Sequence, residues 1–132
     1  MAETTNQEDY VQKAERIIKG LTEGSRERGG AKMATDTQLR KILSLSNRIL
    51  SRLQVQGLGE NSPLEGELLA MVQSLRVQIV YQSARLEAVK HFQERTGLLD
   101  QLKKVETFGH FIAFHRYLEA LTAYQKYYAS LR

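Results

Sequence analysis

The sequence contains no cysteine and a single proline among its 132 residues. Without cysteine the chain forms no disulfide, holds no cysteine-containing metal site and has no thiol nucleophile, so a reducing, cytoplasmic setting is expected. No apolar run approaches the roughly 20 residues that span a bilayer. The N-terminal stretch also lacks the basic start and apolar core of a secretory signal. We therefore expect no membrane partner.

Acidic residues are scarce in one part of the chain. Overall, 19 Lys and Arg residues outnumber 15 Asp and Glu residues, giving a net charge of +4 and a pI of about 9.4. Basic minus acidic residues give +3 over 35–56 and +2 over 107–132, against 0 over 1–34 and −1 over 57–106. A basic excess gathered in two segments favours a polyanionic partner.

The spacing of apolar residues predicts an all-α protein. A hydrophobic content of 42% and a charged content of 26% are typical of globular proteins, and apolar residues recur every three or four positions. We expect a compact bundle of about five helices in a single domain, 35–132, preceded by a variable N-terminal helix and Gly-rich linker, 1–34. The expected helices cover 10–21, 35–55, 63 to beyond 90 with a break near 96–97, a short helix within 96–106, and 107 onward.

Two capping boxes are predicted at helix starts. Thr35 is followed three positions later by Gln38, and Ser62 is followed by Glu65 with Pro63 at the first helical position. In such a pair each side chain accepts a hydrogen bond from an otherwise unpaired backbone N–H. The sequence therefore predicts that helices begin directly after Thr35 and Ser62.

A row of basic residues follows one side of the predicted helix 35–55. At 100° per residue Lys41, Arg48 and Arg52 fall together, roughly opposite an apolar face. Asp36 is the only carboxylate in this segment, so the usual intrahelical ion-pair partners are missing. Three solvated side chains on an outer face would give the same pattern, but the lack of acids favours sequence-independent contact with phosphates.

Catalytic patterns are absent from the sequence. There is no glycine-rich phosphate loop, no nucleophile elbow and no helical pair of histidines at metal-ligand spacing. His110 and His115 are five positions apart, which turns them away from a common helix face, so a shared metal is not expected. We predict a protein that is not an enzyme and needs no metal or cofactor; a small helical nuclease is the contrary hypothesis.

The most apolar segment is FIAFHRYLEALTAYQKYY, residues 111–128. Aromatic and aliphatic side chains cover most of this predicted helix, as in a helix contacted on several sides. Packing inside the bundle or against a neighbouring protein is the favoured interpretation. Base stacking on this helix is disfavoured because stacking platforms combine exposed aromatic rings with a dense basic groove.

Three segments in order carry a resemblance to a known family. They are TDTQLRKILSLSNRIL, VYQSARLEAVKHF and FGHFIAFHRYLEALTAYQKYY, spread over about residues 35–128. Together they resemble the small subunit of type III-A CRISPR effector complexes, the Csm small-subunit family. The resemblance implies a non-catalytic helical bundle, present in several copies, that lines a channel for guide RNA and target RNA and contacts their phosphates, neighbouring CRISPR subunits and copies of itself.

The resemblance also suggests RNA-binding residues. Arg40, Arg85, Arg116 and Lys126 lie within the matching segments. To these we add the basic row and Arg76, which flanks the apolar stripe of the third predicted helix. The complete predicted RNA-binding set is Arg40, Lys41, Arg48, Arg52, Arg76, Arg85, Arg116 and Lys126. The alternative function is a helical adaptor whose aromatic C-terminal helix docks a protein partner.

Overall fold

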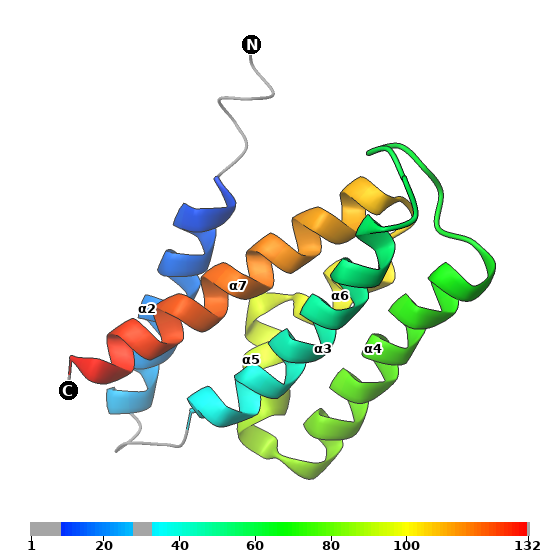
Figure 1. The fold of residues 1–132 in the computed structure, drawn as a ribbon. Coiled ribbons are helices and arrows are strands. Elements are labelled where there is room, and N and C mark those ends of the chain that lie inside the picture. Colours follow the sequence, from blue (N-terminus) through cyan, green and yellow to red (C-terminus); the bar gives the residue numbers. More distant parts are fainter. Residues whose placement is uncertain (1–8, 28–32, 132) are drawn as a thin grey trace.

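The computed structural model describes residues 9–27 and 33–131. In this part of the chain the elements are α2 (Tyr10–Glu27), α3 (Asp36–Gln54), α4 (Gly66–Arg85), α5 (Glu87–Thr96), α6 (Leu98–Lys103) and α7 (Phe108–Ser130). They form an all-α bundle with no strand among the described residues, which confirms the predicted fold class. Helix α7 runs across the bundle with α2 on one side and α3 on the other, and α4 lies beyond α3 (Figure 1).

Helix α7 is the central helix, as predicted. Its buried side chains include Phe111, Phe114 and Leu118, none more than 1% exposed. The Tyr117 hydroxyl donates to the Thr96 carbonyl at the end of α5 over 2.7 Å. The dense apolar sequence is thus explained by neighbours on several sides within the chain.

Two other polar contacts attach α7 to segments far away in sequence. The Gln125 side-chain amide donates to the Ala34 carbonyl, just before α3, over 2.7 Å. The Tyr128 hydroxyl donates to the Glu15 carboxylate of α2 over 2.8 Å, and this bond raises the pKa of Tyr128 to about 12. These bonds tie the C-terminal part of α7 to α2 and to the segment before α3.

The predicted capping box at Thr35 is confirmed. The Thr35 hydroxyl accepts from the Gln38 backbone N–H over 3.1 Å, and the Gln38 side chain accepts from the Thr35 backbone N–H over 2.9 Å. Helix α7 begins with the same arrangement at Thr107, where His110 takes the place of Gln38. The imidazole Nδ1 of His110 accepts from the Thr107 backbone N–H over 3.3 Å.

The predicted capping box at Ser62 is wrong. Helix α4 begins at Gly66, and the Ser62 hydroxyl instead accepts from the Gly59 N–H over 2.9 Å. Residues 62–64 pair with the backbone at the start of α7 instead of forming a helix. Phe108 N–H donates to the Ser62 carbonyl and Leu64 N–H donates to the Glu106 carbonyl, each over 2.9 Å. This pairing keeps residues 62–64 extended and buries Leu64.

The close approach at the start of α7 requires a glycine. The Gly109 N–H donates to the Glu60 carbonyl over 2.8 Å. A Cβ at position 109 would lie 2.8 Å from that same oxygen. The loop that connects α3 and α4 is therefore held directly against α7.

Two other predicted boundaries also differ. The first helix continues to Glu27 rather than ending at 21, because packing of Leu21, Thr22 and Ser25 outweighs the cost of Gly24 within the helix, about 1 kcal/mol. Part of the predicted linker, 28–32, lies outside the described residues.

The predicted long third helix is interrupted at Leu86. This residue is extended, with φ −128° and ψ 108°, and separates α4 from α5. The break lets α5 turn back against α4 and bury Val89 and Phe92. The end of α5 was predicted correctly, at Gly97, whose φ of 70° suits a residue without a side chain.

Candidate nucleic-acid interface

The basic row on α3 lies on the surface of the protein. Lys41, Arg48 and Arg52 are all exposed, while Leu39 and Ile42 of the same helix are buried. Within the described residues, no ion pair involves any of the three basic side chains. Their charges are therefore available to an external anion.

The one carboxylate of this segment is already engaged. Asp36 Oδ2 lies 3.7 Å from the guanidinium of Arg40 and 3.4 Å from the ammonium of Lys126 on α7. Both cations are well exposed, so each pair contributes little to stability. The pairing nevertheless turns the Asp36 carboxylate toward α7, and the basic row has no ion-pair partner among the residues that the structure describes.

A groove between α3 and α4 lies beside the basic row. Its volume is about 590 Å³, and it is lined by Thr37, Arg40, Lys41, Ile42, Ser44, Leu45, Arg48, Gln78 and Gln82. We call it the α3–α4 groove. None of these described lining residues is acidic, so its charge comes entirely from cationic side chains.

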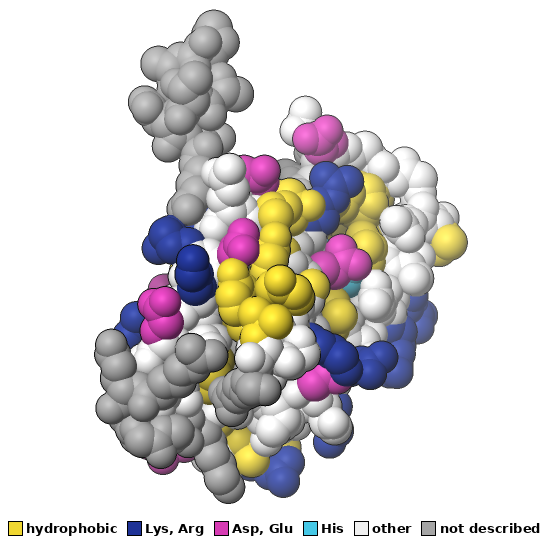
Figure 2. Space-filling view, turned by 90° about the vertical axis from the view of Figure 1, so that its left-hand side faces the viewer, with side chains coloured by type: hydrophobic (Ala, Val, Ile, Leu, Met, Phe, Trp, Pro, Cys, Tyr) yellow, Lys and Arg dark blue, Asp and Glu magenta, His cyan; other side chains and the backbone are white. Residues whose placement is uncertain are grey.

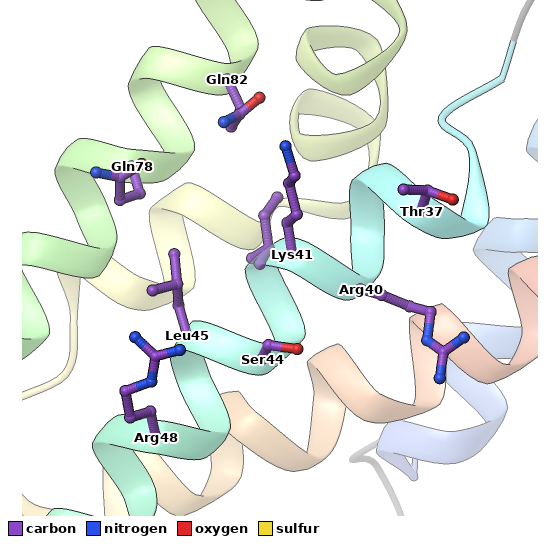
Figure 3. A pocket seen from close by; sticks show the side chains of 9 residues that line it. Thr37, Arg40, Lys41, Ser44, Leu45, Arg48, Gln78 and Gln82 are labelled. Carbon is purple, nitrogen blue, oxygen red and sulfur yellow. The ribbon is translucent and has the colours of Figure 1, made fainter.

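The two walls of the groove differ in chemistry. Lys41 extends from α3 toward Gln82 of α4, Arg48 lies beside Leu45 on α3, and Arg40 points away from α4 (Figure 3). The α3 wall thus offers positive charge, which attracts phosphate. The α4 wall offers amides, which both donate and accept hydrogen bonds.

The structure distributes the eight predicted RNA-binding residues over several surfaces. Arg40, Lys41 and Arg48 line the groove, and Arg52 continues the row of Lys41 and Arg48 along α3. On α4, Arg85 lies with its guanidinium carbon 5.6 Å from the centroid of the Tyr81 ring.

The remaining predicted residues lie elsewhere. Arg76 is partly buried and donates to the Gln73 side chain over 3.0 Å. Arg116 is exposed on α7, and Lys126 pairs with Asp36. Neither Arg76, Arg116 nor Lys126 lines the groove.

Sequence reasoning missed the uncharged half of the groove. Gln78 and Gln82 are spaced four positions apart on α4, so they lie on one face of the helix. That spacing was visible in the sequence. The sequence did not indicate, however, that this face of α4 borders the basic row of α3.

A buried hydrogen bond lies on the core side of α3. Ser46 Oγ is 2.8 Å from His115 Nδ1 of α7, and both residues are at most 3% exposed. Burial lowers the pKa of His115, and the nearby Glu119 carboxylate, 3.7 Å from Nε2, opposes this effect in part. A neutral imidazole with its proton on Nε2 accepts a hydrogen bond from the Ser46 hydroxyl at Nδ1. The pair connects α3 to the central helix.

Both histidines of α7 make hydrogen bonds within the chain. His110 serves the cap of α7 and His115 bonds to Ser46. Over residues 9–27 and 33–131 no three His, Asp or Glu side chains come together as metal ligands. The same residues contain no helix that is long and apolar enough to cross a membrane.

The aromatic end of α7 has only a small exposed part. Tyr127 is 54% exposed and packs edge-on against Tyr128, with ring centroids 5.2 Å apart. On the α2 side of the molecule, hydrophobic side chains form a strip bordered by acidic and basic groups (Figure 2). An adaptor role for this helix would depend on exposed apolar surface of this kind, because the large apolar side chains of α7 other than Tyr127 are buried in the core or packed against it.

Comparison with known proteins identifies relatives over nearly the whole chain. The family described as Csm2 Type III-A matches residues 5–130, a span that includes α2 as well as the region from 35 onward. A Mycobacterium tuberculosis protein named CRISPR system Cms protein Csm2 is 40% identical over 122 residues, 92% of each chain. A protein of the same name from Streptococcus thermophilus is 38% identical over 121 residues, 92% of each chain. Another from Enterococcus italicus is 31% identical over 97 residues, which are 71% of this chain and 67% of the relative.

Proposed function

Because the chain belongs to the Csm2 Type III-A family and is a small subunit of a type III-A CRISPR complex, we propose that it binds RNA through the phosphate backbone without reading sequence. The observation that carries this proposal is the α3–α4 groove. Its cations, Arg40, Lys41 and Arg48, have no acidic residue among the described groove-lining side chains.

Phosphate binding fits the chemistry of this surface. Lysine and arginine on one helix present a row of donors to successive phosphates, and each neutralised phosphate releases counterions. Arg52 extends the row beyond the groove, so one strand can run along α3. No groove-lining residue is a carboxylate that would repel it.

The proposed role in the complex is structural. We propose a non-catalytic scaffold, present in several copies, that lines a channel for guide RNA and target RNA and contacts neighbouring subunits. The exposed apolar side chains Val77 and Val80 on α4 and Tyr127 on α7 offer surface for such protein contacts. Hydrolysis would belong to other subunits.

The test is a binding measurement on purified protein. Fluorescence anisotropy with two unrelated single-stranded RNAs of equal length, over a salt series, should give similar affinities that fall steeply with salt. Replacing Lys41, Arg48 and Arg52 together with alanine should weaken both complexes about equally and reduce the salt slope by roughly three units. Circular dichroism should show unchanged helicity.

A matched control separates the groove from net charge. Lys90→Ala, Lys103→Ala and Lys104→Ala remove the same amount of charge from exposed positions on α5, on α6 and after α6, outside the groove. We expect this control to retain most of the affinity. Equal losses in the two triple variants would contradict a localised site, and wild-type protein that fails to bind RNA at low salt would contradict the proposal for the free subunit.

A further inference from the structure

Tyr81 is an exposed aromatic residue next to the proposed RNA groove. It is 55% exposed on α4, whereas all four phenylalanine residues of this protein are buried. The guanidinium carbon of Arg85, one helical turn later, lies 5.6 Å from the ring centroid. We call these two side chains the α4 rim.

Helix geometry places the α4 rim beside the groove rather than across the helix from it. At 100° per residue, Arg85 lies roughly 20° and Tyr81 roughly 60° around α4 from Gln78, which lines the groove. The buried residues Leu75 and Ile79 lie on the other side of Gln78. From core to solvent, α4 therefore presents apolar residues, then the groove-lining amides, then the rim.

The chemistry of the rim complements that of the α3 wall. A tyrosine ring and a planar guanidinium both stack on nucleic-acid bases, which phosphate-binding lysines do not do. Glu67 at the start of α4 and Glu87 beyond its end are separated by a stretch without any carboxylate. A strand held by its phosphates on α3 would meet no acidic group of α4 along this stretch.

We propose that the α4 rim stacks an unpaired base of single-stranded RNA whose phosphates lie along the α3 wall of the groove. This inference rests on the proposed function and deepens it. Tyr81 provides the stacking surface and Arg85 positions the ring while adding positive charge. Any base has a face to stack, so the contact preserves sequence-independent binding.

Abasic RNA separates stacking from phosphate binding. Anisotropy titrations would use an intact RNA and a fully abasic RNA of equal length, with wild-type protein, Tyr81→Ala and Tyr81→Phe. Tyr81→Ala should weaken binding of the intact RNA roughly 5- to 100-fold, as expected for the loss of one stacked base. It should leave binding of the abasic RNA unchanged, and Tyr81→Phe should behave as wild type.

Tyr127→Ala is the matched control, because Tyr127 is exposed to a similar degree, 54%, on a different helix. It should leave both affinities unchanged. A Tyr81→Ala variant that binds intact RNA as wild type does, or that loses affinity for intact and abasic RNA equally, would overturn the stacking proposal.

The same titrations distinguish a failure of the stacking inference from a failure of the proposed phosphate binding. If the alanine variant of Lys41, Arg48 and Arg52 weakens both RNAs while Tyr81→Ala weakens neither, phosphate binding stands and the stacking inference fails. If neither variant affects binding, both proposals fail at this surface.

Discussion

Two surface grooves of nearly equal size differ sharply in charge. The α3–α4 groove has a volume of about 590 Å³ and is lined by three cations and no carboxylate among its described lining residues, and of the three only Arg40 has an ion-pair partner, Asp36. A second groove, on α2, has about 580 Å³ and is lined by Gln12, Glu15, Arg16, Lys19, Gly20 and Glu23. Here two carboxylates accompany two cations. Groove size therefore gives no reason to prefer either groove as the proposed phosphate site, whereas the arrangement of charge does.

The difference originates in the local sequence. Residues 1–34 carry six basic and six acidic side chains, while 35–56 carry four basic and one acidic. The single acid of the second segment, Asp36, faces Lys126 of α7. Mixed charge on a helix is typical of a solvated face, and one-sided charge is typical of a polyanion-binding face.

The largest expected effect is a loss of stability in the core that supports both grooves. Phe114 is 1% exposed in α7, the helix that contacts both α2 and α3. Phe114→Ala should lower the free energy of unfolding by about 3 to 5 kcal/mol, because it leaves a cavity in the shared core. Urea denaturation followed by circular dichroism measures this change. Near-wild-type stability would place this ring outside the core.

The fold was predictable where local signals agree with tertiary packing. Thr35 and Gln38 form the expected capping box, and the apolar density of residues 111–128 correctly predicted a central helix. The signals failed where long-range pairing decides the structure. Ser62 carries a valid cap pattern, yet its carbonyl accepts from Phe108 N–H of a segment that is distant in sequence.

About half of the candidate site could be predicted. Helical periodicity and a charge count were enough for the basic row of Lys41, Arg48 and Arg52. The amide wall depends on α4 lying beside α3, which single-helix periodicity does not specify. The apolar stripe of α4 does indicate its buried face, which contains Val72, Leu75 and Ile79, but it does not indicate which helix lies beside the amides.

A pair of single substitutions sharpens the comparison of the grooves. Lys41→Glu in the α3–α4 groove and Lys19→Glu in the α2 groove change the net charge equally, and both positions are exposed. We expect Lys41→Glu to weaken RNA binding about tenfold, equivalent to about 1.4 kcal/mol, and Lys19→Glu to have little effect. Anisotropy at fixed ionic strength checks this. Equal losses would mean that overall charge, not the groove, governs binding.

The attachment of α3 to α7 should depend on pH. Burial holds the pKa of His115 below the ordinary value of 6.5, with Glu119 opposing. The unfolded chain therefore takes up the proton first, so the free energy of unfolding should fall as the pH drops from above 6.5 toward the folded-state pKa. Urea denaturation between pH 7.5 and 5 measures this fall, and His115→Gln should reduce its slope. Identical slopes would contradict the assignment.

The smallest effect on stability is expected when the hydrogen bond between α7 and α2 is removed. Tyr128→Phe removes the hydroxyl that donates to Glu15 but keeps the ring. Because the hydrogen bond raises the pKa of Tyr128 from 10 to about 12, its contribution is present below pH 10 and is lost as the pH rises through 12. We expect a small decrease in Tm at neutral pH, far below that of Phe114→Ala, with Tyr127→Phe as the control.

RNA affinity should be unchanged in Tyr128→Phe, because the bond joins α7 to α2. The α3–α4 groove is lined by α3 and α4, and α4 lies on the far side of α3 from α7 (Figure 1). A loss of RNA binding in this variant would show that the two sides are coupled through α7. In that case the neutral charge of the α2 groove would no longer be sufficient reason to exclude it from RNA recognition.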